Sequence, residues 1–301
     1  MEKSAVIIIN PSSGREKALE YEEKIKSTIK IDYPNLSVKY TEGEGDATRF
    51  AGDAGENRID LVVSVGGDGT VNEIVNGLAG FENPPILGII PLGTVNDFAR
   101  SFNIPFQPEE AIELLIKGVQ KKADIGIAND KYFTNILGVG NPVEAVHNVD
   151  SDEKLKIGSL AYVKAIASEM LDDTIFPIRL EMDEIDWEGN VAVLLVALID
   201  SLGGMKFILS DVDKGDGNFH IFAIEKLNIP ELINMAPSLI LGDISNSENV
   251  KYFKSKNLKI RTLNHDYRES DIDGEKGPEL PLELKVLPKH LTIISGIDDE
   301  V

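Results

Sequence analysis

Short apolar runs alternate with helical patterns along the first 130 residues. Helices are predicted near residues 15–30, around Asp46–Gly55, from about Val71, after Pro91 and over residues 108–118. Each apolar run precedes such a helix, and the runs lie at residues 5–9, 36–40, 59–65 and 86–90. Alternation of continuous apolar strands with helices favours a parallel, doubly wound, Rossmann-like sheet.

Beyond residue 120 the helical patterns become sparse and short strands dominate. Helices are predicted only over Ser159–Leu171 and Pro230–Leu241. Gly, Asp, Asn and Pro separate the predicted strands, which lie at Tyr132–Leu137, Ile175–Met182, Val191–Ile199, Phe219–Ile224, Leu258–Leu263, Leu282–Val286 and Leu291–Ile294. Such a pattern predicts an antiparallel β-sandwich or flattened barrel.

The expected architecture is therefore α/β plus β, in two domains. An N-terminal doubly wound α/β domain is expected over residues 1–125, and a C-terminal antiparallel β-sandwich domain over residues 126–301. For the last predicted strand, a return to the sheet of the N-terminal domain is the alternative to a place in the β-sandwich. An interdomain cleft between the two is the expected ligand site.

Composition narrows the class of protein. The chain of 301 residues has no cysteine, which excludes disulfides and thiolate metal sites, and its four histidines lack zinc-ligand spacing. A formal net charge of −21 disfavours nucleic acid as a partner. The apolar stretch near the N-terminus is too short, and followed too soon by polar residues, to be a signal peptide. The longest apolar run, Val191–Ile199, has at most half the length of a membrane span. A cytoplasmic protein is expected.

Gly66-Gly67-Asp68-Gly69-Thr70 lies between an apolar strand and a helix. A glycine turn there lets a phosphate approach the first helical N–H groups, at the positive end of the helix dipole. Neither a Walker loop nor a dinucleotide fingerprint is present. Asp68 would repel a bare phosphate, which favours an intervening Mg²⁺ or a donor that needs a base. A tight turn with an Asp or Thr cap is the alternative.

Two further polar, glycine-containing segments also follow predicted strands. They are NPSSG at residues 10–14 and GTVNDFAR at residues 93–100. Because the carboxyl ends of parallel strands share one edge of a sheet, where ligands bind, the segments are expected to meet there.

These segments, with TEGEGDA at residues 41–47, resemble the diacylglycerol kinase catalytic family in order and spacing. SDVDKGDGNF at residues 210–219 is similar to the acidic metal-binding turn of that family, and DIDGEKGPELP at residues 271–281 to its Asp-Gly-Glu segment. The resemblance is closest to soluble bacterial lipid kinases and covers nearly the whole chain. It implies transfer of the γ-phosphate of ATP to a lipid hydroxyl, with diacylglycerol giving phosphatidic acid as the first choice.

The resemblance also implies ATP and Mg²⁺ as cofactors. The implied nucleotide-binding residues are Asn10, Pro11, Ser12, Ser13, Gly14, Thr41, Gly67, Asp68, Gly69, Thr70, Val71, Asn72, Glu73 and Thr94. Ordinary helix caps at Asn10 or Asn72 are the alternative there.

A carboxylate is needed to take the proton of the acceptor hydroxyl. The resemblance gives this role to Glu275, with Asp273 as the alternative base, although Asp-Gly is also a strong hairpin signal.

The implied metal ligands are Asp213, Asp216 and Asn218, and Asp68, Asp97 and Asp124 would extend an acidic network towards the ion. A plain hairpin loop is the alternative for the Asp216 segment.

Several alternatives remain open for the acceptor and for partners. Asp211 and Asn141-Pro142 depart from the family pattern beside the lipid-facing half. Another lipid alcohol, a soluble substrate as in NAD kinase, and a non-catalytic nucleotide or lipid sensor are the competing functions. A transient, peripheral membrane encounter helped by Arg15 and Lys17 is expected, although interleaved glutamates favour a solvated helix face. Exposed strand edges are compatible with a homodimer.

Overall fold

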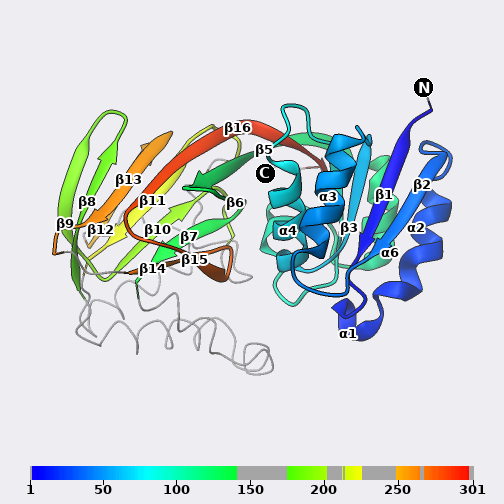
Figure 1. Ribbon diagram of the computed structural model, residues 1–301, viewed down its shortest axis with the longest axis horizontal. Helices are drawn as coiled ribbons and strands as arrows, with labels where there is room; N and C mark the ends of the chain where they lie inside the picture. Colours follow the sequence, from blue (N-terminus) through cyan, green and yellow to red (C-terminus); the bar gives the residue numbers. More distant parts are fainter. Residues whose placement is uncertain are drawn as a thin grey trace. The chain divides into compact units, whose positions relative to one another are not determined.

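The computed structural model describes residues 2–140, 175–201, 212, 214–225, 249–264 and 268–297 (Figure 1). The chain forms two compact units, one of residues 1–125 with 288–301 and the other of residues 126–287. The helices predicted over Ser159–Leu171 and Pro230–Leu241 lie outside the described residues, as do Asp211, Asp213 and Asn141-Pro142.

A parallel sheet forms the centre of the first unit. Its strand order is β2–β1–β3–β4, followed by β16, and all four neighbouring pairs are parallel. The strand bounds are β1 (Ser4–Ile9), β2 (Asn35–Tyr40), β3 (Leu61–Gly66), β4 (Ile86–Pro91) and β16 (Leu282–Ser295). Every residue of β3 is buried, which explains its uninterrupted apolar sequence.

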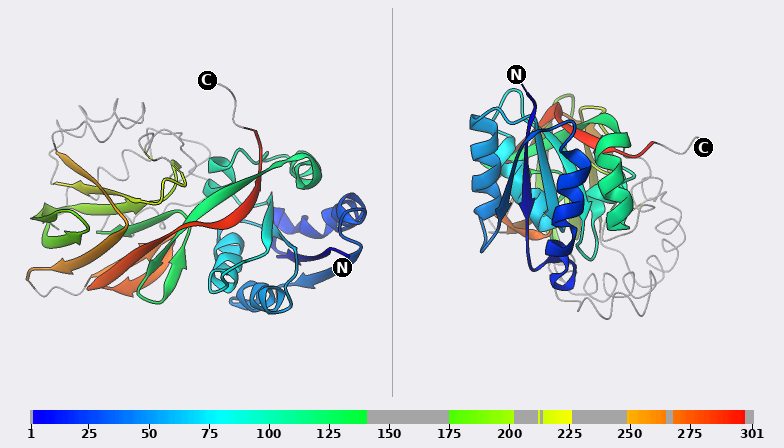
Figure 2. Two further views of the ribbon diagram at one scale, coloured as in Figure 1. Left: turned by 90° about the horizontal axis from the view of Figure 1, so that it is seen from above. Right: turned by 90° about the vertical axis from the view of Figure 1, so that its right-hand side faces the viewer.

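Helices cover both faces of this sheet (Figure 2). Helix α2 packs against α6, and α3 packs against α4. The helix bounds are α1 (Ser13–Glu16), η1, a 3₁₀ turn (Ala18–Tyr21), α2 (Glu22–Ile29), α3 (Asp46–Glu56), α4 (Asp68–Leu78), α5 (Asp97–Ser101) and α6 (Pro108–Lys117). The predicted doubly wound α/β fold is confirmed.

The helix predicted near residues 15–30 starts later in the structure than the sequence pattern indicates. Regular α-helix begins only at Glu22, because Gly14, Arg15 and Glu16 have φ values of 63°, 56° and 68° and Ala18–Tyr21 form a 3₁₀ turn. Left-handed backbone is incompatible with a continuous right-handed helix, so α1 is a turn rather than the first part of α2.

Antiparallel strands form the second unit. The ten-stranded sheet that includes the parallel strands continues from β16 as β13–β8–β9, and β5 pairs with β16 and β6. A six-stranded sheet has the order β12–β11–β10–β7–β14–β15. The bounds are β5 (Val119–Ala128), β6 (Lys131–Phe133), β7 (Ile136–Val139), β8 (Phe176–Met182), β9 (Asp186–Val191), β10 (Val193–Ala197), β11 (Phe219–Ile224), β12 (Val250–Ser255), β13 (Asn257–Thr262), β14 (Glu269–Ile272) and β15 (Glu275–Glu279).

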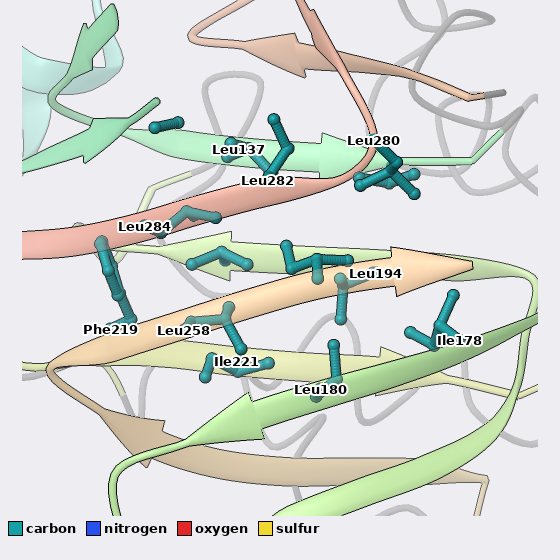
Figure 3. Packing of buried hydrophobic residues seen from close by; sticks show 14 of the residues in the cluster. Leu137, Ile178, Leu180, Leu194, Phe219, Ile221, Leu258, Leu280, Leu282 and Leu284 are labelled. Carbon is teal, nitrogen blue, oxygen red and sulfur yellow. The ribbon is translucent and has the colours of Figure 1, made fainter. Parts of the chain in front are cut away.

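The core of the second unit lies between these two sheets (Figure 3). Side chains of Leu137 and Ile221 on one sheet belong to the same buried cluster as Ile178, Leu258 and Leu282 on the other. Exposure alternates along β13, as expected for a strand that has one face in a sandwich. The predicted antiparallel β-sandwich is confirmed.

Two strand boundaries correct the predictions. The strands predicted over Leu282–Val286 and Leu291–Ile294 form one strand, β16, which continues through Pro288. The backbone N–H of Lys289 donates to Asp124 Oδ1 at 2.6 Å, so the polar interruption is supported from β5. Conversely, the single strand predicted over Tyr132–Leu137 is divided between β6 and β7.

Candidate functional site

The carboxyl ends of four parallel strands bring the glycine-containing segments to one edge of the first sheet. Asn10 follows β1, Thr41 follows β2, Gly67 follows β3 and Gly93 follows β4. Backbone hydrogen bonds join neighbouring segments, from Asn10 N to Val65 O at 3.0 Å and from Gly14 N to Leu92 O at 3.0 Å. The segments therefore form one continuous surface at the strand ends, where α/β proteins bind ligands.

Helix α4 starts earlier than the sequence pattern predicts. It begins at Asp68 rather than near Val71, and Gly67 is its N-cap in an extended conformation. Asp68, Gly69 and Thr70 consequently form the first turn, whose N–H groups have no acceptor within a helix. These donors and the positive end of the dipole make this terminus suitable for an anion such as a phosphate.

The glycines of this region are required by contacts within the protein. A Cβ on Gly67 would lie 3.0 Å from Gly93 Cα, and one on Gly93 would lie 2.6 Å from Gly67 Cα. A Cβ on Gly66 would collide with the side chain of Thr70. The loops after β3 and β4 thus touch backbone to backbone, which is possible only without side chains.

Asp68 connects the same two loops. Its carboxylate accepts hydrogen bonds from Asn96 N at 2.6 Å and from Phe98 N at 3.4 Å, at the N-terminus of α5. Asn96 in turn accepts from Gly93 N at 3.0 Å and donates to Gly93 O at 2.8 Å. The sequence offered an ion, a proton donor or a helix cap for Asp68, and the structure shows its carboxylate at the N-terminus of α5 rather than capping its own helix. The bracing by Asn96 was not predicted.

The other predicted nucleotide-binding residues differ in accessibility. Thr70 and Val71 are buried on the inner side of α4. The exposed members are Ser12, Gly69 and Thr94, and the half-buried members are Asn10, Pro11, Ser13, Gly14, Thr41, Gly67, Asp68, Asn72 and Glu73. Hydroxyls and backbone groups of the exposed members are therefore available to a ligand, whereas the Val71 side chain belongs to the core.

Asp97 and Asp124, predicted to extend an acidic network, are both buried. Asp97 is the first residue of α5, and Asp124 accepts from Lys289 N at 2.6 Å, between β5 and β16. Asp124 therefore supports the backbone of β16.

The Asp-Gly-Glu segment is a two-residue hairpin between β14 and β15. Asp273 and Gly274 have φ values of 52° and 91°, and Ile272 pairs with Glu275. Positive φ at both turn residues is typical of a type I′ turn, so the hairpin interpretation describes the backbone correctly. Glu275 is exposed at the first position of β15.

The Asp273 carboxylate anchors this hairpin to the segment before β7. Its Oδ2 accepts from Thr134 N at 2.8 Å and Thr134 Oγ1 at 3.1 Å. Its Oδ1 accepts from Asn135 N at 2.8 Å and Ile136 N at 3.0 Å. Thr134 and Asn135, which are buried, were not predicted as site residues. The only signal in the sequence is that two polar residues interrupt an apolar run.

The Asp216 turn offers one carboxylate among the described residues. Asp216 Oδ1 accepts from Asn218 N at 2.8 Å, while Oδ2 receives Lys254 Nζ at 3.1 Å and lies 3.4 Å from His220 Nε2. Burial opposes ionisation, but Lys254, His220 and the Asn218 N–H together hold the pKa of Asp216 below its usual value.

The donor set fits a divalent ion only in part. Within the described ranges no three His, Cys, Asp or Glu residues gather closely enough to hold a metal. Asp213, the other predicted carboxylate of this turn, lies outside those ranges. A cation bound here would share Asp216 with Lys254.

Comparisons with known proteins agree with this architecture. Residues 4–128 match the family model of the diacylglycerol kinase catalytic domain. Residues 137–295 match that of the YegS C-terminal NAD kinase beta sandwich-like domain.

Relatives match over the full length. A diacylglycerol kinase from Bacillus subtilis is 36% identical, with 97% of this chain and 96% of the relative covered. One from Staphylococcus aureus is 34% identical, with 99% and 94% covered. The crystal structure of a diacylglycerol kinase from Bacillus anthracis superposes with a TM-score of 0.82 at 30% identity, covering 98% of this chain and 97% of that one. This chain belongs to the diacylglycerol kinase catalytic domain family, whose members are ATP-dependent kinases with an alcohol acceptor.

Proposed function

We propose that this protein transfers the γ-phosphate of ATP to the hydroxyl of diacylglycerol, giving phosphatidic acid and ADP. One observation carries the proposal: four glycine-containing segments meet at one sheet edge in a chain with full-length relatives named diacylglycerol kinase. The family supplies ATP use and an alcohol acceptor, while diacylglycerol as the acceptor is our inference.

In this proposal the ATP phosphates lie against the N-terminus of α4. Backbone N–H groups of Gly67–Thr70 and hydroxyls of Ser12, Ser13, Thr41 and Thr94 bind them. Asp68 contributes indirectly, because its carboxylate holds the GTVNDFAR loop. That arrangement leaves the phosphate contacts to groups without negative charge.

Glu275 acts as the general base. The acceptor oxygen bonds to the γ-phosphorus while the bond from this phosphorus to the β–γ bridging oxygen breaks, and ADP leaves with that oxygen. The hydroxyl proton passes to the carboxylate of Glu275. Asp273, which accepts four hydrogen bonds from residues 134–136, holds the hairpin instead of serving as the alternative base.

A divalent cation, for which we choose Mg²⁺, supplies charge neutralisation on the phosphates when it is bound. A Mg²⁺ held by Asp216 and Asn218, with Asp213 of the same sequence segment, would be a separate ion that takes no direct part in phosphoryl transfer. The turn is tight, with φ of 85° at Gly215 and 78° at Gly217, and carboxylate and carbonyl oxygens are the ligands that Mg²⁺ and Ca²⁺ prefer.

Diacylglycerol dissolves in membranes, so turnover requires contact with a membrane surface. No helix in the described part of the chain has the length and apolar character of a membrane span. We propose a transient peripheral contact to which the exposed side chains of Arg15 and Lys17 contribute. A homodimer through strand edges stays a prediction.

A soluble acceptor is the second candidate. The match of residues 137–295 to a beta sandwich-like domain of NAD kinase type is the observation that favours NAD. Radiolabelled ATP with Mg²⁺ and a panel of acceptors in mixed micelles separates the candidates. The panel contains diacylglycerol, monoacylglycerol, ceramide, sphingosine and undecaprenol, with NAD in solution.

Labelled phosphatidic acid as the dominant product supports the proposal. Labelling of NAD, or of another lipid in preference to diacylglycerol, would replace it. ATP binding without labelling of any acceptor would favour a sensor.

A further inference from the structure

The N-terminus of α3 is capped by a side chain from a different helix. Its N-cap residue, Gly45, has φ 83° and no side chain to accept a first-turn N–H. Oε2 of Glu73, on α4, accepts hydrogen bonds from Gly45 N at 3.1 Å and Ala47 N at 3.0 Å. The carboxylate thus satisfies two donors that lack helical acceptors and lies at the positive end of the α3 dipole.

A second contact reinforces this connection. Thr48 Oγ1 donates to the backbone carbonyl of Glu73 at 3.0 Å, so both the side chain and the main chain of Glu73 bind the start of α3. The two helices also approach closely, since a Cβ on Gly77 would lie 2.8 Å from Ala51 Cβ. Glu73 therefore has one well-defined position relative to α3.

The segment that precedes α3, residues 41–46, is here called the Thr41 loop. Asp46 closes it from within, because its Oδ2 accepts from Glu42 N at 2.8 Å and Gly43 N at 3.2 Å. Thr41 N donates to Ile9 O at 2.9 Å and ties the beginning of the loop to β1. Near the other end of the loop, Gly45 N donates a hydrogen bond to the Glu73 carboxylate.

We propose that Glu73 is a positioning residue, which holds the Thr41 loop beside the α4 N-terminus and does not itself contact the nucleotide. This inference rests on the proposed ATP site, to which Thr41 belongs. Substitutions of Glu73 can distinguish a hydrogen-bonding role from a role that depends on its negative charge. A glutamine at position 73 can accept both N–H bonds through one amide oxygen, whereas a role that depends on negative charge is lost in both Glu73→Gln and Glu73→Ala.

The test combines amide hydrogen exchange without nucleotide and the dissociation constant of a non-hydrolysable ATP analogue. Wild type, Glu73→Gln, Glu73→Ala and the control Glu44→Ala, an exposed glutamate of the same loop, are compared. In Glu73→Ala we expect faster exchange at Gly45 and Ala47 and weaker analogue binding, each by about five- to tenfold, the size of a lost helix cap. In Glu73→Gln and Glu44→Ala both quantities stay within about twofold of wild type.

Equal weakening of analogue binding by Gln and Ala, with unchanged exchange at Gly45 and Ala47, would overturn the proposal in favour of a charge-dependent ligand contact. Unchanged exchange and binding in Glu73→Ala would overturn it as well. Should Glu73→Ala not fold, Thr48→Val removes the second contact alone, and about threefold faster exchange around residues 45–48 is expected. Because the exchange measurement needs no turnover, it remains valid even where phosphoryl transfer to a lipid is not found.

Discussion

The strand-end loops of the α/β unit and the Asp-Gly-Glu hairpin of the β unit are held in place differently. In the loops the carboxylates of one motif cap the helix of another, as Asp68 does for α5 and Glu73 for α3. In the hairpin Asp273 binds three consecutive backbone N–H groups outside its own motif, and Glu275 is exposed.

Acidic residues of the same motif therefore have different structural roles in the two regions. At the proposed phosphate site, the carboxylates of Asp68 and Glu73 face helix N-termini, where they stabilise the loops. In the hairpin, Asp273 accepts four hydrogen bonds and Glu275 is exposed, which is the arrangement expected if Asp273 anchors the turn and Glu275 takes the proton, as we propose.

The largest expected effect is on proton transfer. Glu275→Gln keeps the shape of the side chain but removes the base, so kcat is expected to fall about 10²- to 10⁴-fold with the KM for ATP unchanged. Initial rates with diacylglycerol micelles measure this loss. Glu279→Gln, an exposed glutamate on the same strand, is the control and should retain the wild-type rate. A normal kcat in Glu275→Gln would leave the segment as a hairpin turn only.

Removal of the hairpin anchor is the next largest effect. Asp273→Ala leaves Thr134 N, Asn135 N and Ile136 N without their acceptor, so we expect the free energy of unfolding to fall by about 2–4 kcal/mol. Urea unfolding measures this change, and Asp273→Asn, which keeps one acceptor oxygen, should be intermediate. A large loss of kcat at unchanged stability would instead identify Asp273 as the base.

A smaller effect is expected where the loops touch. In Gly93→Ala the new Cβ meets the backbone of Gly67 and the Asn96 side chain, so the loops must separate. We expect a loss of about 1–3 kcal/mol in the free energy of unfolding, together with a raised KM for ATP. Gly43→Ala is the matched control, because nothing lies within 4 Å of its Cβ position. Equal melting temperatures for the two variants would contradict the described contact.

The smallest effect concerns Asp183, far from these motifs in the sequence. Hydrogen bonds from Asn257, Lys256 and Ser255 outweigh burial and lower the pKa of Asp183 to about 2. Its stabilising contribution is therefore complete above the unfolded-state pKa of about 3.9 and is lost as the pH falls towards 2.

Thermal unfolding between pH 7 and pH 2 tests this linkage. Asp183→Ala should lower stability by about 1 kcal/mol at pH 7 and converge with wild type near pH 2. A constant difference between the two proteins over the whole pH range would show that ionisation of Asp183 is not involved.

Local patterns predicted β1 to β4 closely, because buried parallel strands are continuous apolar runs. They missed β5, β9, β12, β14 and β15, whose sequences mix charged and polar residues with apolar ones, and Pro288 divided the pattern of β16. The β16 strand continues past Pro288 because the backbone of Lys289 binds Asp124, a residue that is distant in the sequence. A local pattern cannot reveal such a contact.

For the site, the motifs predicted which segments meet but not what their side chains do. In the sequence Glu73 looks like a ligand-binding acid, and Asp68 like such an acid or a cap of its own helix, because the helix N-termini that they cap belong to other segments. The bonds that Asp273 accepts from residues 134–136 are equally invisible without the sheet. Contacts between distant segments, rather than motif composition, decide these roles.

We propose that the strand-end loops bind ATP and that Glu275 takes the proton. Steady-state γ-phosphate transfer from ATP to diacylglycerol in wild type, Gly93→Ala and Glu275→Gln tests both roles. For Gly93→Ala we expect a raised KM for ATP with a smaller change in kcat. For Glu275→Gln we expect a kcat lower by about 10²- to 10⁴-fold at an unchanged KM. Phosphate transfer by Glu275→Gln at the wild-type rate, or none by wild type, would contradict this proposal.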